Sequence, residues 1–251
     1  MSADKKIILV TGASRGIGAE IALLAGERGW RVGVNYHRSA EAANHVVEQV
    51  RRSGGEAVAL QADVGKLAEV QRMFRELDEA FGTLDVLVNN AGVLANFRIT
   101  DVDEDNVREL YEANVFSAYY CAREAVRRMA TSRGGRGGAI VNMSSVASRL
   151  GGLAGGTAYA GSKGALDSFN LSLAKELGPE GIRVNALRPG LIATDIHAIH
   201  GGVAHAQELA KTAVPMGRTG SAREVAEAAL WLATEQASYV HGAVLDVAGG
   251  R

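Results

Sequence analysis

The chain has 251 residues, of which 47% are hydrophobic and 22% charged, a globular composition that excludes a disordered protein or a coiled coil. Lys and Arg number 27 against 28 Asp and Glu, and aromatic residues make up 5%, so the sequence offers neither a basic surplus nor a stacking platform for nucleic acid. The lone Cys121 cannot form an internal disulfide, and the first apolar run, Ile7 to Val10, is too short for a signal peptide or membrane span. We therefore expect a cytoplasmic protein without nucleic-acid or membrane partners.

Short apolar runs alternate with helical patterns along the whole chain. The runs predict strands at residues 7–11, 32–35, 57–61, 84–88, 139–143, 183–187 and 243–247. Nearly continuous Val, Ile, Leu and Ala runs are typical of parallel strands that are covered on both faces. The sequence therefore predicts an α/β fold, a doubly wound Rossmann-type parallel seven-stranded sheet with helices on both faces, in a single domain over residues 1–251.

A glycine-rich segment follows the first predicted strand and leads into a helix. Gly12, Gly16 and Gly18 have no side chains, so backbone N–H groups and the helix N-terminus could approach a pyrophosphate. The alternative is a tight turn between strand and helix with no ligand. The position directly after the first strand favours a dinucleotide site.

The end of the second predicted strand indicates which dinucleotide is bound. An NAD-binding protein would place a carboxylate here to accept a hydrogen bond from the ribose 2′-OH, and this chain has Asn35 instead. Arg38 and Arg15 lie nearby, and guanidinium groups pair well with a phosphate. The pattern favours NADP, with NAD as second choice. The alternative is that Arg38 is a solvated loop residue.

Asn114 is a polar residue on the apolar face of a predicted helix, in register with Val107, Leu110 and Tyr111. Burying an unbonded amide costs about 1–3 kcal/mol, so the side chain must find partners. It either ties the helix to nearby backbone or holds a water molecule in a site. The sequence leaves both interpretations open.

Tyr159 and Lys163 lie one turn apart on a predicted helix and point the same way. An ammonium group could lower the pKa of the phenol from about 10 toward 7–8, which needs roughly 3–4 kcal/mol of differential stabilisation. Ser144 and Ser145 follow the fifth predicted strand, at the sheet edge where such folds bind ligands, and either could hold a substrate carbonyl.

Residues 188–220 break the alternation, with mixed polarity, two of the three prolines and a weak helical pattern. Long irregular inserts are usually functional, so we expect a substrate lid. His197, His200 and His205 lie in it, but no cysteine and only Asp195 could complete a zinc site. We expect no metal.

Together these motifs resemble the short-chain dehydrogenase/reductase family over nearly the whole chain. The matching pieces stand in family order: Thr11-Gly-x-x-x-Gly-x-Gly18, Asp63-Val64, Asn89-Asn-Ala-Gly92, Asn114, Ser145, Tyr159-x-x-x-Lys163 and Pro189-Gly190. Within the family the chain most resembles the bacterial branch that contains glucose 1-dehydrogenases and 3-oxoacyl-carrier-protein reductases. Many relatives have Val-Asp-Gly-Gly where this chain has Val247-Ala-Gly-Gly250.

The resemblance implies a role for each matching residue. Tyr159 would be the general acid/base, and Lys163 would bind the nicotinamide ribose and lower the pKa of Tyr159. Ser145 would orient the substrate oxygen, and Asn114 would hold a water of a proton relay. The residues expected to bind the cofactor are Gly12, Ser14, Arg15, Gly16, Ile17, Gly18, Asn35, His37, Arg38, Asp63, Val64, Asn90, Ala91, Gly92, Tyr159, Lys163, Pro189, Gly190, Ile192 and Thr194. The family also implies a homotetramer built through the long fourth and fifth helices.

The sequence thus predicts an NADP-dependent oxidoreductase that transfers a hydride between nicotinamide and an alcohol or carbonyl compound. Residues 93–98, residues 148–157 and the segment after Gly190 should form the substrate walls. A sugar or small-ketone dehydrogenase and a 3-oxoacyl thioester reductase stay open as alternatives, because Arg98, Arg149 and His197 fit either. A non-catalytic NADP-binding regulator is a third alternative, against which the intact Ser, Tyr, Lys and Asn set argues.

Overall fold

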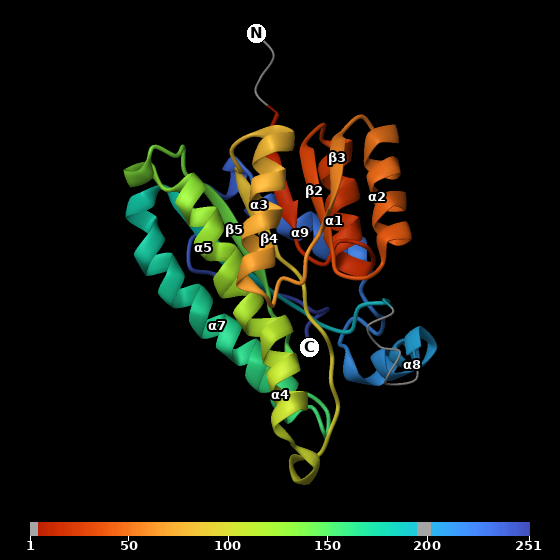
Figure 1. The fold of residues 1–251 in the computed structure, drawn as a ribbon. Helices are drawn as coiled ribbons and strands as arrows, with labels where there is room; N and C mark the ends of the chain where they lie inside the picture. The colour runs from red at the N-terminus through yellow and green to blue at the C-terminus, as the bar shows by residue number, and fades with distance from the viewer. Residues whose placement is uncertain (1–4, 195–201) are drawn as a thin grey trace.

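The computed structural model describes residues 5–194 and 202–251 (Figure 1). Its centre is a sheet of seven parallel strands in the order β3-β2-β1-β4-β5-β6-β7. The strands are β1 (Ile7–Val10), β2 (Arg31–Tyr36), β3 (Glu56–Gln61), β4 (Val86–Asn89), β5 (Gly138–Met143), β6 (Ile182–Pro189) and β7 (Val244–Val247). The fold class and all seven predicted strands are confirmed. The strand order reverses between β1 and β4, and ligands bind outside the carboxyl ends of the strands at such a point.

Helices cover both faces of the sheet (Figure 1). Alternate residues of β1 show how the two cores form: Ile8 and Val10 pack on one side, Ile7 and Leu9 on the other, and all four are buried. The first core is closed by α1 (Gly16–Glu27), α2 (Ala40–Arg52) and α9 (Ala222–Leu232). The second is closed by α3 (Leu67–Phe81), α5 (Ser117–Met129) and α7 (Thr157–Leu177).

The predicted fourth helix is not a regular α-helix. It begins as α4 (Glu104–Tyr111), continues as a π-helical turn at Glu112–Phe116 and returns to α-helix in α5. Asn114 lies in the π-helical turn. Single π-helical turns inside α-helices occur often at functional sites, and the sequence periodicity alone does not distinguish them.

The segment 188–220 contains a helix that its sequence shows only weakly. Helix α8 (Gly202–Ala213) lies beyond the carboxyl ends of the strands (Figure 1). Its buried residues are Ala206 and Ala210, and two alanines make too faint an apolar stripe for a clear helical pattern. His205 lies on this helix, whereas His197 and His200 lie outside the described residues.

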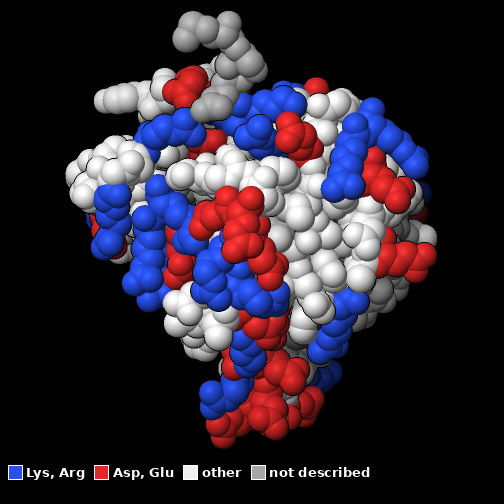
Figure 2. All heavy atoms as spheres, turned by 45° about the horizontal axis from the view of Figure 1, so that its top comes forward, with Lys and Arg blue, Asp and Glu red and all other residues white. Residues whose placement is uncertain are grey.

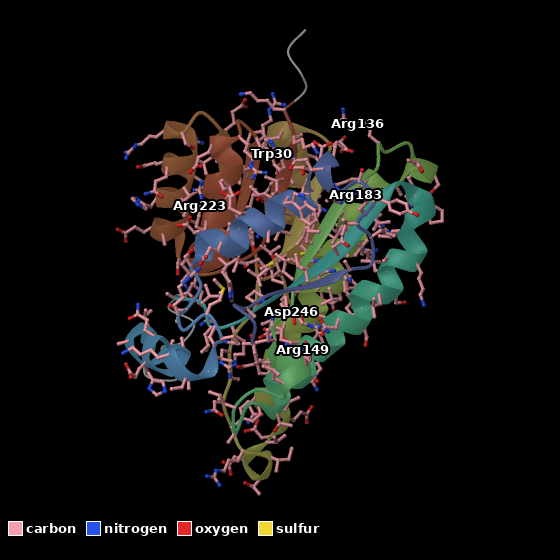
Figure 3. The ribbon with its side chains drawn as sticks, turned by 180° about the vertical axis from the view of Figure 1, so that it is seen from behind. Trp30, Arg136, Arg149, Arg183, Arg223 and Asp246 are labelled. Atoms are coloured by element: carbon pink, nitrogen blue, oxygen red, sulfur yellow. The ribbon has the colours of Figure 1, made fainter. Side chains whose placement is uncertain are left out.

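The surface carries charges of both signs. Lys and Arg alternate with Asp and Glu on the face shown in Figure 2. Many are paired, as where Arg223 on α9 lies 2.6 Å from Glu27 on α1 (Figure 3 labels the arginine). Cys121 is buried, which raises the pKa of its thiol and keeps it uncharged.

In residues 5–194 and 202–251, no helix combines the length and the apolar character needed to cross a membrane. No group of His, Cys, Asp and Glu side chains in the same ranges gathers closely enough to hold a metal ion.

Candidate active site

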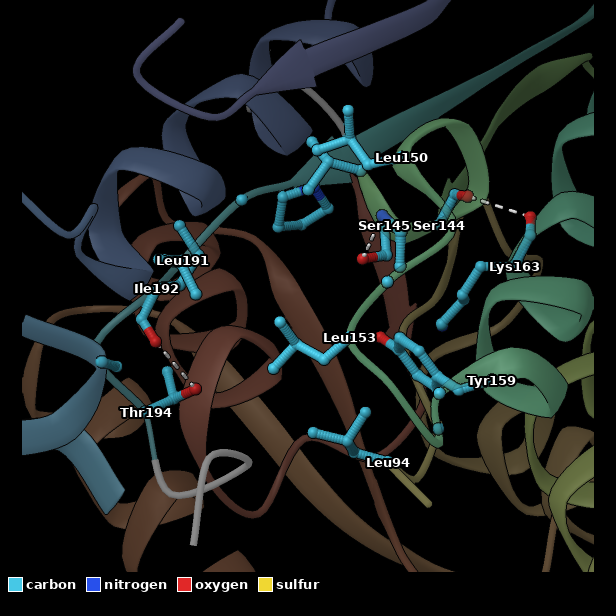
Figure 4. Close-up of a pocket in the computed structure, with 18 of the residues that line it drawn as sticks. Leu94, Ser144, Ser145, Leu150, Leu153, Tyr159, Lys163, Leu191, Ile192 and Thr194 are labelled. Atoms are coloured by element: carbon cyan, nitrogen blue, oxygen red, sulfur yellow. Dashed lines mark hydrogen bonds between the residues drawn. The ribbon is translucent and has the colours of Figure 1, made fainter. Parts of the chain in front are cut away.

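A long groove and an apolar cavity meet at the carboxyl ends of the strands. The groove runs over the glycine loop after β1, the end of β2 and residues 62–64. The cavity lies between the end of β5, helix α7 and the segment after β6 (Figure 4). The two share the lining residues Ile17, Asn90, Gly92, Val93 and Thr194. They therefore form one continuous site at the switch point of the sheet.

The structure brings most of the predicted cofactor residues to this site. The groove is lined by Gly12, Ser14, Arg15, Gly16, Ile17, Asn35, His37, Arg38, Asp63, Val64, Asn90, Ala91, Gly92 and Thr194. The cavity adds Tyr159, Lys163, Pro189, Gly190 and Ile192. Of the predicted set only Gly18 lines neither. Sequence reasoning missed Tyr36 and Lys66, which also line the groove and follow no spacing rule relative to the glycines.

The glycine loop is held against the turn after β4 by close backbone contacts. Gly12 has φ +62°, and a Cβ there would lie 2.9 Å from the Cα of Ala91. Asn90 Nδ2 donates to the carbonyl oxygens of Thr11 at 2.8 Å and Gly12 at 3.1 Å. The hydroxyl of Thr11 accepts from the backbone N–H groups of Asn90 and Ala91. The Asn90 amide therefore shapes the loop from inside the protein.

The groove fits an anionic dinucleotide. Helix α1 begins after Arg15 with no side-chain cap and no acidic residue in its first turn, so its N-terminal N–H groups and positive dipole end remain for an anion. Gly16 has φ +59°, and the nearest atoms to a Cβ built there belong to Thr194 at 3.8 Å, which leaves the loop open toward the groove. A pyrophosphate is the kind of group that such a helix terminus binds.

The side chain of Asn35 is hydrogen-bonded within the protein. Its side chain is buried, its Oδ1 accepts from the N–H of Gly12 at 3.0 Å, and its Nδ2 donates to carbonyl oxygens of Leu60 and Ala62 at 3.1 and 3.2 Å. The amide thus joins the glycine loop to β3. The neighbouring cations, Arg15 and Arg38, are exposed and pair with no carboxylate of the described chain.

Tyr159 and Ser145 face each other in the cavity (Figure 4). Burial raises the pKa of the Tyr159 phenol, and a hydrogen bond with Ser145 partly opposes this by lowering it. The Ser144 hydroxyl points elsewhere and donates to the carbonyl oxygen of Lys163 at 3.1 Å. Ser145 is therefore the serine beside the phenol, and Ser144 fixes the helix that carries the lysine.

Lys163 is buried beneath the tyrosine. Its Nζ donates to the carbonyl oxygen of Met143 at 2.9 Å and lies 5.8 Å from the centre of the Tyr159 ring. Burial lowers the pKa of Lys163 to about 8, and the nearby carboxylate of Asp167 partly opposes this by raising it. In this structure the phenol pKa is raised by burial, and the group that opposes this rise is Ser145 rather than Lys163.

Asn114 ties three elements together. Its Oδ1 accepts from the N–H of Val93 at 2.7 Å, and its Nδ2 donates to the Val93 carbonyl oxygen at 3.0 Å and to Ser162 Oγ at 3.0 Å. Ser162 in turn donates to the carbonyl oxygen of Tyr159 at 2.7 Å. These contacts confirm the interpretation that Asn114 ties its helix to nearby backbone. Both amide hydrogens are used, so the side chain has none left to donate to a water.

The cavity walls are mainly aliphatic. They are formed by Val93, Leu94, Val146, Ala147, Leu150, Leu153, Leu191, Ile192, Ala206 and Leu209. Leu150 and Leu153 are 45% and 47% exposed, and exposed apolar side chains that cluster at a cavity are typical of a ligand site. All three predicted wall segments contribute, although Arg98 does not line the cavity. Arg251 also lines it, and no sequence pattern pointed to that residue.

Gly18 lies beneath the loop, and its replacement should destabilise the fold. A Cβ at this position would lie 2.4 Å from Asn90 Nδ2 and 2.6 Å from the Gly12 carbonyl oxygen. We expect Gly18→Ala to lower the free energy of unfolding by about 1–3 kcal/mol, measured by urea denaturation. Gly164→Ala is the matched control, because nothing lies within 4 Å of its Cβ position. Equal stabilities of the two variants would contradict the close packing inferred here.

Comparisons with known proteins agree with this geometry. A family model described as Enoyl-(Acyl carrier protein) reductase matches residues 12–251. The chain is 45% identical over 246 residues to the uncharacterized oxidoreductase YgfF of Escherichia coli, covering 98% of this chain and 99% of that protein. It is 36% identical over 256 residues to a protein of Zymoseptoria tritici named as a probable tetrahydroxynaphthalene reductase, covering 98% and 94%.

Comparison with solved structures indicates the same fold and class of protein. A short-chain dehydrogenase from Burkholderia cenocepacia in complex with NADP superposes with a TM-score of 0.90 at 34% identity, covering 98% of this chain and 97% of that one. The match extends over the sheet, the groove and the cavity residues, since it spans nearly the whole chain. The chain therefore belongs to the short-chain dehydrogenase/reductase family and is an oxidoreductase of the NAD(P)-dependent class that acts on CH–OH groups or carbonyls.

Proposed function

We propose that this protein is an NADPH-dependent reductase of apolar ketones that also runs in the alcohol-oxidising direction, with Tyr159 as general acid/base. One observation carries the proposal: Tyr159, Ser145 and Lys163 converge in an apolar cavity that is continuous with a dinucleotide-shaped groove. When bound, the nicotinamide would supply or accept the hydride at the substrate carbon. The protein would supply position, a proton and a cavity shielded from water.

Each residue then has a task. Ser145 would hold the substrate oxygen beside the Tyr159 hydroxyl, which donates a proton in reduction and removes one in oxidation. Lys163 uses one hydrogen on Met143 and keeps two for the nicotinamide ribose. Asn114 would serve a proton relay through a water bound at its backbone, since the amide is occupied by Val93 and Ser162.

The charged rim of the groove supports NADP over NAD. No carboxylate stands at the end of β2, and Arg38 and Arg15 are exposed there without acidic partners among the described residues. His37 lines the same part of the groove. Guanidinium groups beside a helix N-terminus are suited to the additional 2′-phosphate of NADP.

NADPH should accordingly bind more tightly than NADH. We expect a preference of about 10- to 100-fold, the effect of one charge-assisted hydrogen bond, and Arg38→Ala should remove most of it. Fluorescence titration of both cofactors measures the ratio, with Arg75→Ala on α3 as an exposed control that does not line the groove. Equal affinities in the unaltered protein would refute the assignment.

The aliphatic cavity supports an apolar substrate. A sugar would need several polar partners, and the walls offer mainly leucine, valine and alanine side chains. A 3-oxoacyl thioester is the second candidate, because an acyl chain would also fill aliphatic walls. NADPH consumption measured over ketones, sugars and oxoacyl thioesters tests all three classes.

We also propose the larger organisation that the sequence suggested. Residues 1–251 would form one catalytic domain, 188–220 would act as its lid, and the protein would work in the cytoplasm. A homotetramer would assemble through α4–α5 and α7, where Tyr119 and Leu171 are 50% and 49% exposed. Analytical ultracentrifugation at micromolar concentration tests the assembly, and a monomer would rule it out.

A further inference from the structure

The apolar cavity holds a cation that the proposed chemistry does not use. Lys163 and Arg251 are the Lys and Arg residues found among its described lining residues. Lys163 lies on the cofactor side, beneath Tyr159. Arg251 is partly buried, lies within salt-bridge distance of no carboxylate in the described chain, and is absent from the lining of the cofactor groove. Its place is therefore in the substrate part of the site.

The backbone of Arg251 is hydrogen-bonded to a residue in a chain of ion pairs. Arg149 Nη2 on α6 (Ala147–Leu150) donates to the carbonyl oxygen of Arg251 at 2.9 Å and lies 3.1 Å from Asp246 on β7 (Figure 3). Asp246 also lies 3.5 Å from Arg188, which pairs with Asp167 on α7 at 2.8 Å. Arg188 and Asp167 are mostly buried, and such pairs hold geometry better than exposed ones.

The segment that carries Arg251 is also fixed by its backbone. The carbonyl oxygen of Gly249 accepts from the N–H of Met216, just beyond helix α8, at 3.1 Å. Ala248 lies so close to Gly190 that a Cβ at the glycine would be 2.8 Å from its Cα. Arg251 thus stands where the lid, the end of β6 and α6 meet, and His205 of α8 lines the same cavity.

Arg251 is a partly buried residue of an aliphatic cavity, and its guanidinium has no carboxylate partner among the described residues. A ligand that brings a carboxylate would match the guanidinium with two parallel hydrogen bonds. We propose that the natural substrate is an apolar oxo acid, a ketone with a hydrocarbon body and a carboxylate, and that Arg251 binds the carboxylate. This inference rests on the ketone reductase function proposed above.

Matched pairs of acid and ester test the proposal. The probes are benzoylpropionate, benzoylbutyrate and benzoylvalerate, each compared with its methyl ester, so that the ketone and ring stay constant while the charge and spacing vary. We expect at least one acid to be reduced with about 10-fold or higher kcat/KM than its ester. Arg251→Gln should lower kcat/KM for that acid by about 10- to 100-fold, mainly through KM, and should bring the acid-to-ester ratio close to one.

Two controls separate this inference from others. Arg75→Gln, on the exposed face of α3, should leave the acid-to-ester ratio as it is, and Arg251→Lys should restore part of it. Two results would overturn the carboxylate assignment and leave the ketone reductase function intact. One is that every ester is reduced as well as its acid, and the other is that Arg251→Gln leaves the acid-to-ester ratio of kcat/KM unchanged. Weaker NADPH binding in Arg251→Gln would also overturn it, by moving Arg251 to the cofactor. If NADPH reduces none of the acids or esters, the proposed ketone reductase function itself would be contradicted.

Discussion

Replacing Tyr159 with phenylalanine should lower kcat for ketone reduction by about 100- to 10,000-fold, the usual contribution of a positioned general acid/base. The ring packing in the cavity would be retained, and only the hydroxyl beside Ser145 would be lost. NADPH should still bind, because the groove that fits its phosphates does not include the phenol. Stopped-flow reduction and fluorescence titration measure the two effects separately.

The pH dependence gives the same experiment a second readout. Burial raises the pKa of Tyr159, so the phenol is protonated at neutral pH, which is the form that donates in reduction. Reduction should therefore slow as the pH rises through that pKa, and oxidation should accelerate. Neither the fall in the reduction rate nor the rise in the oxidation rate should occur in Tyr159→Phe. A variant that keeps more than a third of the original kcat would remove Tyr159 from the mechanism.

Replacing Lys163 with methionine should change both catalysis and stability. The variant loses the hydrogen bond to Met143 and the ammonium beneath the Tyr159 ring. We expect kcat/KM to fall by about 100-fold or more, because in the proposed mechanism the ammonium would both orient the cofactor ribose and stabilise a developing phenolate. An unchanged kcat/KM would contradict both roles.

The stability effect follows from the lowered pKa of Lys163, about 8 against an ordinary 10.5. Below pH 8 the lysine is charged in both the folded and unfolded states, and the folded protein bears the cost of burying the charge. Between pH 8 and 10.5 the unfolded state binds more protons, so the free energy of unfolding rises with pH, by at most roughly 3 kcal/mol. Urea denaturation across this range should show the rise in the unaltered protein and not in Lys163→Met. If the free energy of unfolding changes with pH in the same way in both proteins, the side chain of Lys163 would have to be solvated.

The strands could be predicted because each is covered on both faces and therefore reads as a short apolar run. The glycine loop and the Tyr159–Lys163 pair could be predicted because their function depends on local spacing within one loop or one helical turn. Helix α8 could not, since two buried alanines leave almost no periodic signal. Nor could the π-helical turn at Asn114, because its apolar spacing is that of an ordinary helix.

By itself, the order of residues determined the fold, the family and the candidates for the reactive side chains, since each of these is written in patterns that extend over a few neighbouring positions. Only the tertiary structure decided which polar groups remain available. Asn35 was an expected cofactor contact, yet its amide is taken up by Gly12, Leu60 and Ala62. Ser144 also lines the cavity, but its hydroxyl donates to the backbone of helix α7, and Ser145 is the serine beside the phenol. The physical reason is that a hydrogen-bonding group is committed by whatever partner folding brings within 3 Å or so, and those partners come from strands and helices distant in the chain.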